Sequence, residues 1–415
     1  MTAPERSGAT DRLAVHGARV LNVRDGRWEE HGTVVMEGGL IVEVGSRVPN
    51  DCPVISVPES SLIPGLIDVH THVLLQGTLD RYDLAWQMIE ENLGHRIASG
   101  VRAMHICLDH GFTTIRDLGT EGGGYADVGL RNAAAEGIVP GPRMVVAGPA
   151  IRSTGRYPLE GEKRSVTFPV GVDTCTGVDA CRETVRTQAM YGIDWLKIYV
   201  SGGPLLPGSM GYPDGRAAFT EAEVAALVDE AHRQGLKVAA HAQCLTGTRM
   251  AIEAGVDSIE HGYAITPALA RTMAEKRIHL VATLLVTREA AASGWYVEDW
   301  VLEAHRQSFR NCVEADVPIA LGTDVGGFEW TGVSQAEELE IMVELGQSPI
   351  EALRSATICG AELLGQEGLI GELAVGARAD VVAVTGDPLD DVSAVRNVDL
   401  VVKDGKCHLQ PNQLQ

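Results

Sequence analysis

Residues 63–75 read IPGLIDVHTHVLL, an apolar stretch that ends in two histidines one residue apart. A β-strand sends alternate side chains to the same face, so we expect His70 and His72 to point the same way, with Thr71 opposite. Two imidazoles side by side pack poorly in an apolar core, but they are a good start for a metal site. The tripeptide alone fits two surface histidines at a strand end equally well, and the rest of the chain has to decide.

Short apolar runs of the same kind recur through the middle of the chain. Several are separated by helical segments such as TEAEVAALVDEAHRQG, in which Thr220 and Glu223 have capping-box spacing and Gly235 ends the helix. Strand-like runs that alternate with helices over about 260 residues predict an α/β protein with a (β/α)8 TIM barrel. The eight runs are residues 66–72, 112–119, 143–148, 194–202, 236–242, 257–262, 278–285 and 317–324.

The two ends of the chain have a different texture. Residues 12–62 read as short strands and turns, and the segments ADVVAVTG and VDLVVKDGKC near the other end resemble them. Neither end has enough alternating apolar surface for a sheet core of its own, so we predict one small β-sandwich domain built from both termini. The predicted boundaries are 1–62 for its N-terminal part, 63–365 for the barrel and 366–415 for its C-terminal part.

Composition narrows the class of partner. A formal net charge of −22 argues against nucleic acid or an anionic membrane surface as a partner. The polar start MTAPERSGATDR lacks the apolar region of a secretory signal, and no apolar run approaches membrane-spanning length. The eight cysteines are scattered without a C-x-x-C pair, which suits a reducing compartment. We expect a cytoplasmic protein that binds a small-molecule substrate, and homo-oligomer formation stays open.

Polar residues follow the apolar runs where a barrel of this class places its chemistry, at the C-terminal ends of the strands. Singly, each has an ordinary explanation: a lone histidine is usually structural, and Asp324 after Gly-Thr could cap a helix. Lys197 is harder to dismiss, because lysine is almost never buried unless paired. The joint occurrence of six such residues in barrel order predicts a metal site. They are His70, His72, Lys197, His241, His261 and Asp324.

Seven motifs together resemble the amidohydrolase superfamily, particularly its imidazolonepropionase-like and Xaa-Pro-dipeptidase-like branch. The motifs are PGLIDVHTH, GFTTIRDLG, DWLKIYVSGG, AAHA, DSIEHG, GTD and GELAVGARADVVAV. The resemblance covers nearly the whole chain, including the composite β-sandwich. It implies that His70 and His72 hold one metal ion, that His241 and His261 hold a second, and that Lys197, carboxylated by CO2, bridges both. Asp324 would bind the first metal and also move protons.

The resemblance therefore implies a binuclear metal-dependent amidohydrolase. A carbamate on lysine is an anionic bidentate ligand, and lysine must be neutral to react with CO2, a state that burial near cations favours. Two zinc ions roughly 3.5–4 Å apart can hold a bridging hydroxide that attacks a carbonyl. The implied reaction is hydrolysis of an amide or peptide-like C–N bond, with Asp324 as proton shuttle and a dipeptide or N-acyl amino acid as substrate.

The chain departs from many relatives at two places near the expected site. Thr-Gly-Gly-His after the third strand is replaced by Ser-Thr-Gly-Arg-Tyr at 153–157, and His-Ala-His after the fifth by His-Ala-Gln at 241–243. Neither change removes a predicted metal ligand, but both change the pocket. We expect residues 151–180 to form a loop that could cover the site, and an arginine in it to bind a substrate carboxylate. The candidate substrate-binding residues are Tyr199, Tyr212, Arg152, Arg156 and Gln243.

Other functions stay open at this point. A mononuclear-metal deaminase of the same superfamily would carry a glutamate soon after the strand-five histidine, whereas Ala-Gln-Cys-Leu follows His241. Hydrolysis of a cyclic amide, carbamate or urea-type bond is compatible with the same ligands. A non-catalytic scaffold would usually have lost ligands, and here all six positions are filled. We also expect Arg116 and Asp117 to form a buried ion pair that supports the top of the barrel.

Overall fold

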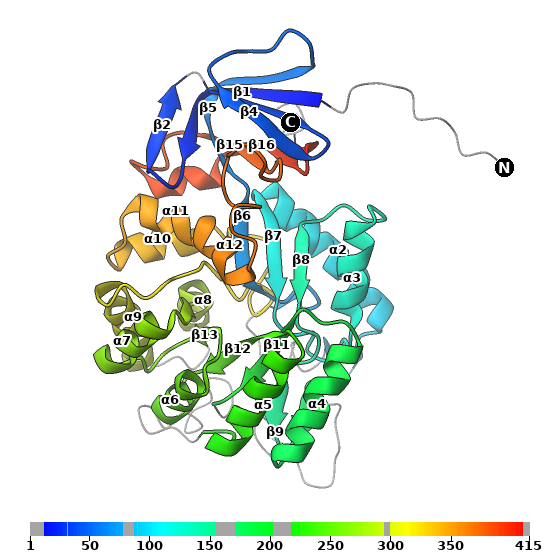
Figure 1. Cartoon of the computed structure of the whole chain (residues 1–415), viewed down its shortest axis with the longest axis vertical. Coiled ribbons are helices and arrows are strands. Elements are labelled where there is room, and N and C mark those ends of the chain that lie inside the picture. The colour runs from blue at the N-terminus through cyan, green and yellow to red at the C-terminus, as the bar shows by residue number, and fades with distance from the viewer. Residues whose placement is uncertain are drawn as a thin grey trace, which may run out of the picture.

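The structure is a computed structural model and describes residues 12–30, 32–77, 87–88, 90–154, 171–201, 217–293 and 299–409. Strands from both ends of the chain lie together at the top of Figure 1, and the helices and strands of the middle of the chain lie below them. The middle of the chain, from β6 to α12, contains the parallel strands that carry most of the predicted metal ligands.

The strands from the two termini form one eight-stranded sheet with the order β17-β16-β15-β5-β1-β3-β4, and β2 pairs with β1. Strand β5 pairs in parallel with β1 and antiparallel with β15, so it joins the two chain ends. The division into two facing layers and the domain boundaries stay predictions. The strands are β1 (Arg12–Asn22), β2 (Arg27–Glu30), β3 (Thr33–Glu37), β4 (Leu40–Gly45), β5 (Val54–Pro64), β15 (Val381–Thr385), β16 (Val398–Lys403) and β17 (Lys406–Leu409).

The middle of the chain contains two sheets with parallel pairing throughout. Apart from β10, most residues of these strands are buried, and strands buried on both faces read in sequence as nearly continuous apolar runs. One sheet has the order β6 (Leu66–Thr71), β7 (Phe112–Asp117), β8 (Arg143–Val146). The other has the order β10 (Asp173–Cys175), β9 (Ile151–Ser153), β11 (Trp195–Tyr199), β12 (Lys237–Ala242), β13 (Ser258–His261), β14 (His279–Val281).

Residues 317–325 connect the two sheets. Parallel bridges join Ile319 to Leu280 on one side and Val325 to Thr71 on the other. The Asp324 amide also donates to the His70 carbonyl at 2.8 Å. The strand order of a barrel thus continues from β14 through this segment to β6. The predicted α/β class is confirmed, whereas closure into an eight-stranded barrel stays a prediction, since the described strands form two sheets joined by bridges.

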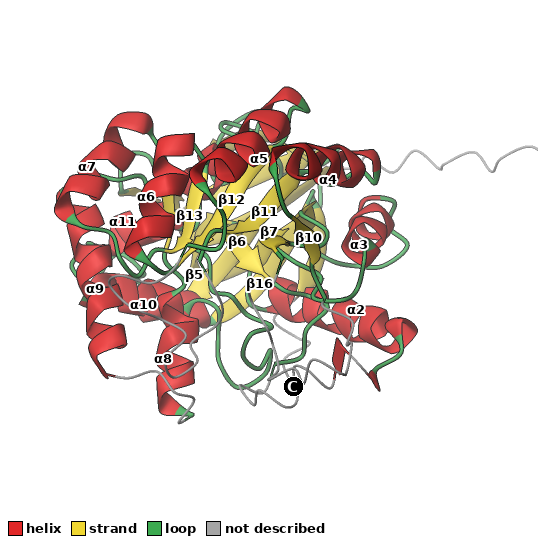
Figure 2. Cartoon of the chain, turned by 90° about the horizontal axis from the view of Figure 1, so that it is seen from below, coloured by secondary structure: helices red, strands yellow, loops and turns green. Residues whose placement is uncertain are grey.

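Helices pack around the outside of these strands, as the view from below in Figure 2 shows. Helix α5 begins after Thr220, and the predicted capping box with Glu223 is present. Within the described residues, no helix is both long enough and apolar enough to span a membrane. The helices are α2 (Leu93–Asp109), α3 (Ala126–Ala135), α4 (Val178–Met190), α5 (Glu221–Arg233), α6 (Leu245–Ala254), α7 (Pro267–Lys276), α8 (Leu284–Ala292), α9 (Asp299–Glu314), α10 (Glu337–Glu344), α11 (Pro349–Ser355), α12 (Ile358–Leu364) and the 3-10 helix η1 (Val392–Arg396).

The segment 151–180 is not simply a loop, as the sequence had suggested. It contains β9 and β10, which pair in parallel with each other, and α4 begins at Val178. Strands of three residues are too short to leave a periodic apolar pattern, so the sequence gives no sign of them. Residues 155–170 lie outside the described residues.

The close packing of the connecting segment on β6 gives a test of the fold. A Cβ added at Gly322 would lie 2.4 Å from Val281 Cγ1 and 2.7 Å from His70 Cβ. We expect Gly322→Ala to lower the free energy of unfolding by roughly 1–3 kcal/mol, the usual cost of overpacking, as measured by chemical denaturation.

The matched control is Gly129→Ala in α3, where an added Cβ would meet nothing within 4 Å. Alanine is favoured over glycine inside a helix, so this variant should gain up to about 1 kcal/mol. Equal stability of the two variants would contradict the close approach of residue 322 to β6.

Candidate functional site

The structure brings the six predicted metal-ligating residues together at the C-terminal ends of the parallel strands. The Nζ atom of Lys197, in β11, lies 3.3 Å from His70 Nε2 on β6. The rings of His241 in β12 and His261 in β13 lie 4.6 Å apart, and those of His70 and His261 lie 5.1 Å apart. Five of these side chains come from strands or strand ends, so the sheet itself fixes their spacing.

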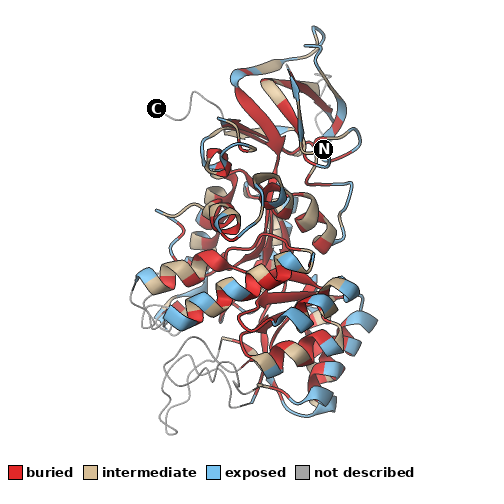
Figure 3. Cartoon of the chain, turned by 90° about the vertical axis from the view of Figure 1, so that its left-hand side faces the viewer, coloured by how far each residue is buried: buried red, intermediate tan, exposed pale blue. Residues whose placement is uncertain are grey.

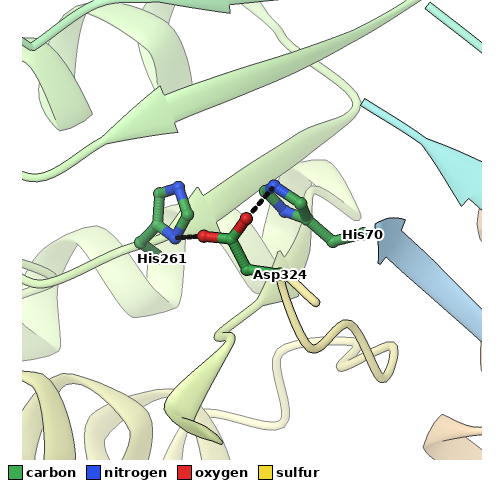
Figure 4. Close-up of side chains that lie close together, drawn as sticks. All are labelled: His70, His261 and Asp324. Carbon is green, nitrogen blue, oxygen red and sulfur yellow. Dashed lines mark ion pairs between the residues drawn. The ribbon is translucent and has the colours of Figure 1, made fainter. Parts of the chain in front are cut away.

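Asp324 lies between His70 and His261 (Figure 4). One carboxylate oxygen, Oδ1, is 3.0 Å from His72 Nε2 and 3.6 Å from His70 Nε2, and the other, Oδ2, is 3.9 Å from His261 Nδ1. Ligand atoms of His70, His261 and Asp324 all lie within 4.8 Å of one another. Imidazole nitrogens and a carboxylate oxygen at this spacing are suitable donors for a divalent metal ion.

The protein also fixes the outer nitrogens of two of these rings. Nδ1 of His70 lies 2.7 Å from a carboxylate oxygen of Glu260, and Nδ1 of His72 lies 2.9 Å from the carbonyl oxygen of Gly119. Both partners are acceptors, so we assign the proton to Nδ1 in each ring. In the neutral form of each ring, Nε2 then has its lone pair directed into the site, which is the arrangement that a metal-binding histidine requires.

A buried ion pair supports His70 from behind. Arg116 Nη2 donates to Glu260 Oε1 at 2.9 Å, and both side chains are fully buried. The guanidinium also donates to the Val69 carbonyl through Nε at 2.6 Å and stacks on the Trp195 ring at 4.3 Å. Because an isolated buried charge is costly, these contacts hold the carboxylate that orients His70.

The predicted ion pair between Arg116 and Asp117 is wrong. Successive residues of a strand point to opposite faces, so the two side chains of β7 cannot meet. The Asp117 carboxylate instead accepts a hydrogen bond from the Val73 amide at 2.6 Å, and Arg116 pairs with Glu260. Sequence reasoning missed Glu260, although a charged residue inside the apolar run DSIEHG was a signal that could have been used.

Charges are unevenly distributed within the site. Burial lowers the pKa of His70 to about 4, and the Lys197 charge adds to this effect. Burial also acts to lower the pKa of His72, but the hydrogen bond and charge of Asp324 outweigh it and raise the pKa to about 9. Burial lowers the pKa of Lys197 to about 8. In this structure the positive charge of protonated His72 balances the negative charge of Asp324. A bound metal cation would balance the same charge.

The candidate substrate-binding residues have different outcomes. Tyr199 is buried beside His241, with ring centroids 4.8 Å apart, and its hydroxyl donates to Glu121 at 2.8 Å. Gln243 is buried just after β12, and its backbone N–H donates to Ser201 Oγ at 2.7 Å. Arg152 lies in β9 and is buried, not in an exposed loop. Arg156 and Tyr212 lie outside the described residues.

Comparison with known proteins gives consistent matches along the chain. The family model for the amidohydrolase family matches residues 61–407. Ochratoxinase of Aspergillus niger is 29% identical over 436 residues, which cover 96% of this chain and 87% of that one. The structure of a Xaa-Pro dipeptidase with bound methionine has a TM-score of 0.86 at 29% identity and covers 96% of this chain and 100% of its own.

A prolidase complexed with N-methylphosphonate-L-proline has a TM-score of 0.85 at 29% identity, again over 96% of this chain and 100% of that chain. These neighbours indicate a TIM-barrel-like α/β fold. Amidohydrolases depend on metal ions, and the buried histidines and Asp324 could bind one. The family match over residues 61–407 means that this chain belongs to the amidohydrolase family and is a hydrolase.

Proposed function

We propose that this protein is a binuclear metal-dependent amidohydrolase that cleaves the peptide-like C–N bond of a dipeptide or an N-acyl amino acid. The observation that carries the proposal is the position of Lys197. Its amine is buried, lies 3.3 Å from His70 Nε2, and has the ligand candidate His241 on the neighbouring strand β12. A lone lysine among histidines is a poor ligand for a single ion, but a carboxylated lysine is suited to bridging two.

The six side chains fit a pair of divalent ions. In the proposal, His70, His72 and Asp324 hold one ion, His241 and His261 hold the other, and carboxylated Lys197 bridges them at the mouth of a closed (β/α)8 barrel. Zinc is the proposed metal, because imidazole and carboxylate donors suit it. When bound, two such ions supply an activated hydroxide and polarise the scissile carbonyl.

Lys197 is prepared for reaction with CO2. Burial lowers its pKa to about 8, so a substantial fraction of the amine is neutral near physiological pH. The neutral Nζ atom forms a bond to the carbon of CO2 and loses one proton, which leaves an anionic carbamate with two oxygens. The charges of Glu260 and Asp324 act to raise the pKa of Lys197 and Arg116 acts to lower it, but burial has the largest effect.

Asp324 can move the proton that hydrolysis requires. Burial acts to raise its pKa, but His70 and His72 outweigh burial and hold the pKa at about 2, so the group is a carboxylate before reaction. Oδ1 faces His72, and we propose that Oδ2 accepts the proton of the nucleophile and then donates it to the leaving nitrogen. An amide nitrogen needs that proton, because its anion is a poor leaving group.

Glu260 is proposed to position His70 for this chemistry without touching substrate. Its Oε2 fixes the His70 ring through Nδ1, and its Oε1 is held by Arg116. Burial acts to raise the pKa of Glu260, but Arg116 and His70 lower it to about 2, so it remains a charged acceptor. Such a charge strengthens the imidazole as a ligand.

Metal content tests the binuclear proposal. Protein purified with zinc and bicarbonate should contain about two metal ions per chain by elemental analysis. Lys197→Ala removes the proposed bridge and should lower the content to about one or less. A content of one ion in the wild-type protein, together with an unmodified Lys197 in a crystal structure, would contradict the proposal and favour the mononuclear deaminase.

Replacement of Asp324 tests the proton shuttle. The variant Asp324→Asn should lose about 10²–10⁴-fold in kcat when measured with excess metal, which is the scale of lost general acid–base catalysis. The control is Asp316→Asn, since Asp316 has a similar positive φ of 56° against 61° at Asp324 but is exposed. Near-normal kcat in metal-loaded Asp324→Asn would show that the proton travels by another route.

Replacement of Glu260 tests its positioning role. Glu260→Gln keeps the shape but leaves Arg116 without its buried counter-charge, so we expect metal affinity to fall about 10–100-fold and stability to fall as well. Affinity is measured by competition with a chelator. The control Glu338→Gln changes another buried glutamate, one that accepts from the amides of Leu284 and Leu285, and should leave metal affinity unchanged. Equal affinity in both variants would contradict the role of Glu260.

A further inference from the structure

Glu121, in the loop after β7, is a buried carboxylate for which the proposed reaction has no use. Its side chain is 7% exposed. Oε1 accepts a hydrogen bond from the Tyr199 hydroxyl at 2.8 Å, whereas Oε2 is buried with no hydrogen-bond partner in the described parts of the chain. No arginine or lysine of those parts forms an ion pair with it within 4 Å. A buried carboxylate oxygen without a donor is costly, and the charges of Arg96 and Lys197 act on Glu121 without donating to it, so Oε2 is open to a donor from a ligand.

Glu121 lies directly beside the proposed metal ligands. A Cβ placed on Gly119 would be 3.3 Å from His72 Cε1 and 3.4 Å from Glu121 Oε1, so the imidazole and the carboxylate flank the same glycine. On its other side, the partner Tyr199 packs against the ring of His241. The hydrogen bond between Glu121 and Tyr199 therefore lies beside His72, a proposed ligand of the first metal ion, and beside His241, a proposed ligand of the second.

The backbone at Glu121 is also strained. Its φ of 41° lies in the left-handed region, which non-glycine residues rarely adopt. The same region is occupied by His261 and Asp324, with φ of 65° and 61°, and by Thr283, which contacts His261. Arg277 at the end of α7, Asp404 and the exposed Asp316 also have positive φ, so this backbone state does not by itself indicate function. Glu121 thus shares an unusual backbone state with two of the proposed metal ligands.

A buried arginine holds the loop that carries Glu121. Arg96 donates through Nη2 to the Thr120 carbonyl at 2.8 Å and through Nε to the Leu74 carbonyl at 3.1 Å. These bonds tie the loop after β7 to the turn that follows His72. The carboxylate is therefore held in place before any ligand binds, which lowers the entropy cost of binding.

A fixed carboxylate with an unused oxygen recognises an N–H donor, and it binds a cationic ammonium most strongly because the hydrogen bond is charge-assisted. In a dipeptide the ammonium is attached to the carbon next to the scissile carbonyl, so it lies close to the metal ions when that carbonyl is attacked. We propose that Glu121 binds the free α-ammonium group of the substrate and that the enzyme prefers dipeptides to N-acyl amino acids. This inference rests on the proposed function and narrows its substrate class.

A matched pair of substrates tests the inference. L-Alanyl-L-leucine and N-propionyl-L-leucine differ only in the ammonium group, and each is assayed with the zinc-loaded enzyme. The wild-type enzyme should have the higher kcat/KM for the dipeptide. Glu121→Gln should lower the ratio of the two kcat/KM values about 10–100-fold, the range of a charge-assisted hydrogen bond. The control Glu136→Gln removes an exposed carboxylate at the end of α3 and should leave the ratio unchanged.

Binding provides a readout that is independent of turnover. Phosphinate analogues of the same two compounds, with and without the ammonium, are titrated into the zinc-loaded protein by calorimetry. The wild-type protein should bind the ammonium analogue about 10–100-fold more tightly, and Glu121→Gln should lose this preference while it keeps its metal content. Equal binding of both analogues by the wild-type protein, a preference that persists in the variant, or loss of metal from the variant would each overturn the inference.

The two proposals fail in different ways. Hydrolysis of both substrates at equal rates by the wild-type enzyme would leave the proposed function standing and overturn the role of Glu121. Hydrolysis of neither substrate, with a clear preference for the ammonium analogue in the binding experiment, would overturn the proposed peptide-like substrate class and support the ammonium site.

Discussion

The contact between Arg116 and Glu260 is the interaction on which the geometry of the site depends. A single guanidinium donates to the Val69 carbonyl in β6 and to Glu260 in β13, and it stacks on Trp195 in β11. It therefore joins strands of both parallel sheets at their centre. Each charge requires the other, because either one alone in this dry setting would cost several kcal/mol. The position of the His70 ring follows from this pair, since Glu260 holds its Nδ1.

Much of the site could be predicted from the sequence because the positions of its residues follow from the strands on which they lie. The two-residue period of a strand places His70 and His72 on one face, and a lysine inside an apolar run has few explanations other than a paired or reactive role. The positions after successive strands meet at one end of a parallel barrel, so the remaining ligands could be assigned from chain order alone. The α/β class could be recognised for the same reason, from repeated runs of similar length.

The other features of the site could not be predicted, because they depend on contacts between residues far apart in the sequence or on local structure without a sequence pattern. Arg116 pairs with a residue 144 positions away, and the choice between this partner and the adjacent Asp117 is set by which face of β7 each side chain occupies. Strands as short as β9 and β10 leave no periodic signal, so Arg152 was expected in a loop and is buried in a strand. Positive φ at Glu121 is invisible in the sequence, because no glycine marks it.

Three carboxylates near the same metal site, the buried Glu260 and Glu121 and the half-buried Asp324, differ in what faces them, and this difference separates their roles. Glu260 is neutralised by Arg116, a cation of the protein itself, and so can only orient. Asp324 faces His70 and His72, whose imidazoles are candidate ligands, so its natural counter-charge is a metal ion or the proton that takes its place. Glu121 has only a neutral tyrosine hydroxyl as hydrogen-bond partner in the described residues, and one oxygen remains open. The charges of Arg96 and Lys197 also act on Glu121, but neither cation donates a hydrogen bond to the open oxygen, and this is the position that we assign to the substrate ammonium.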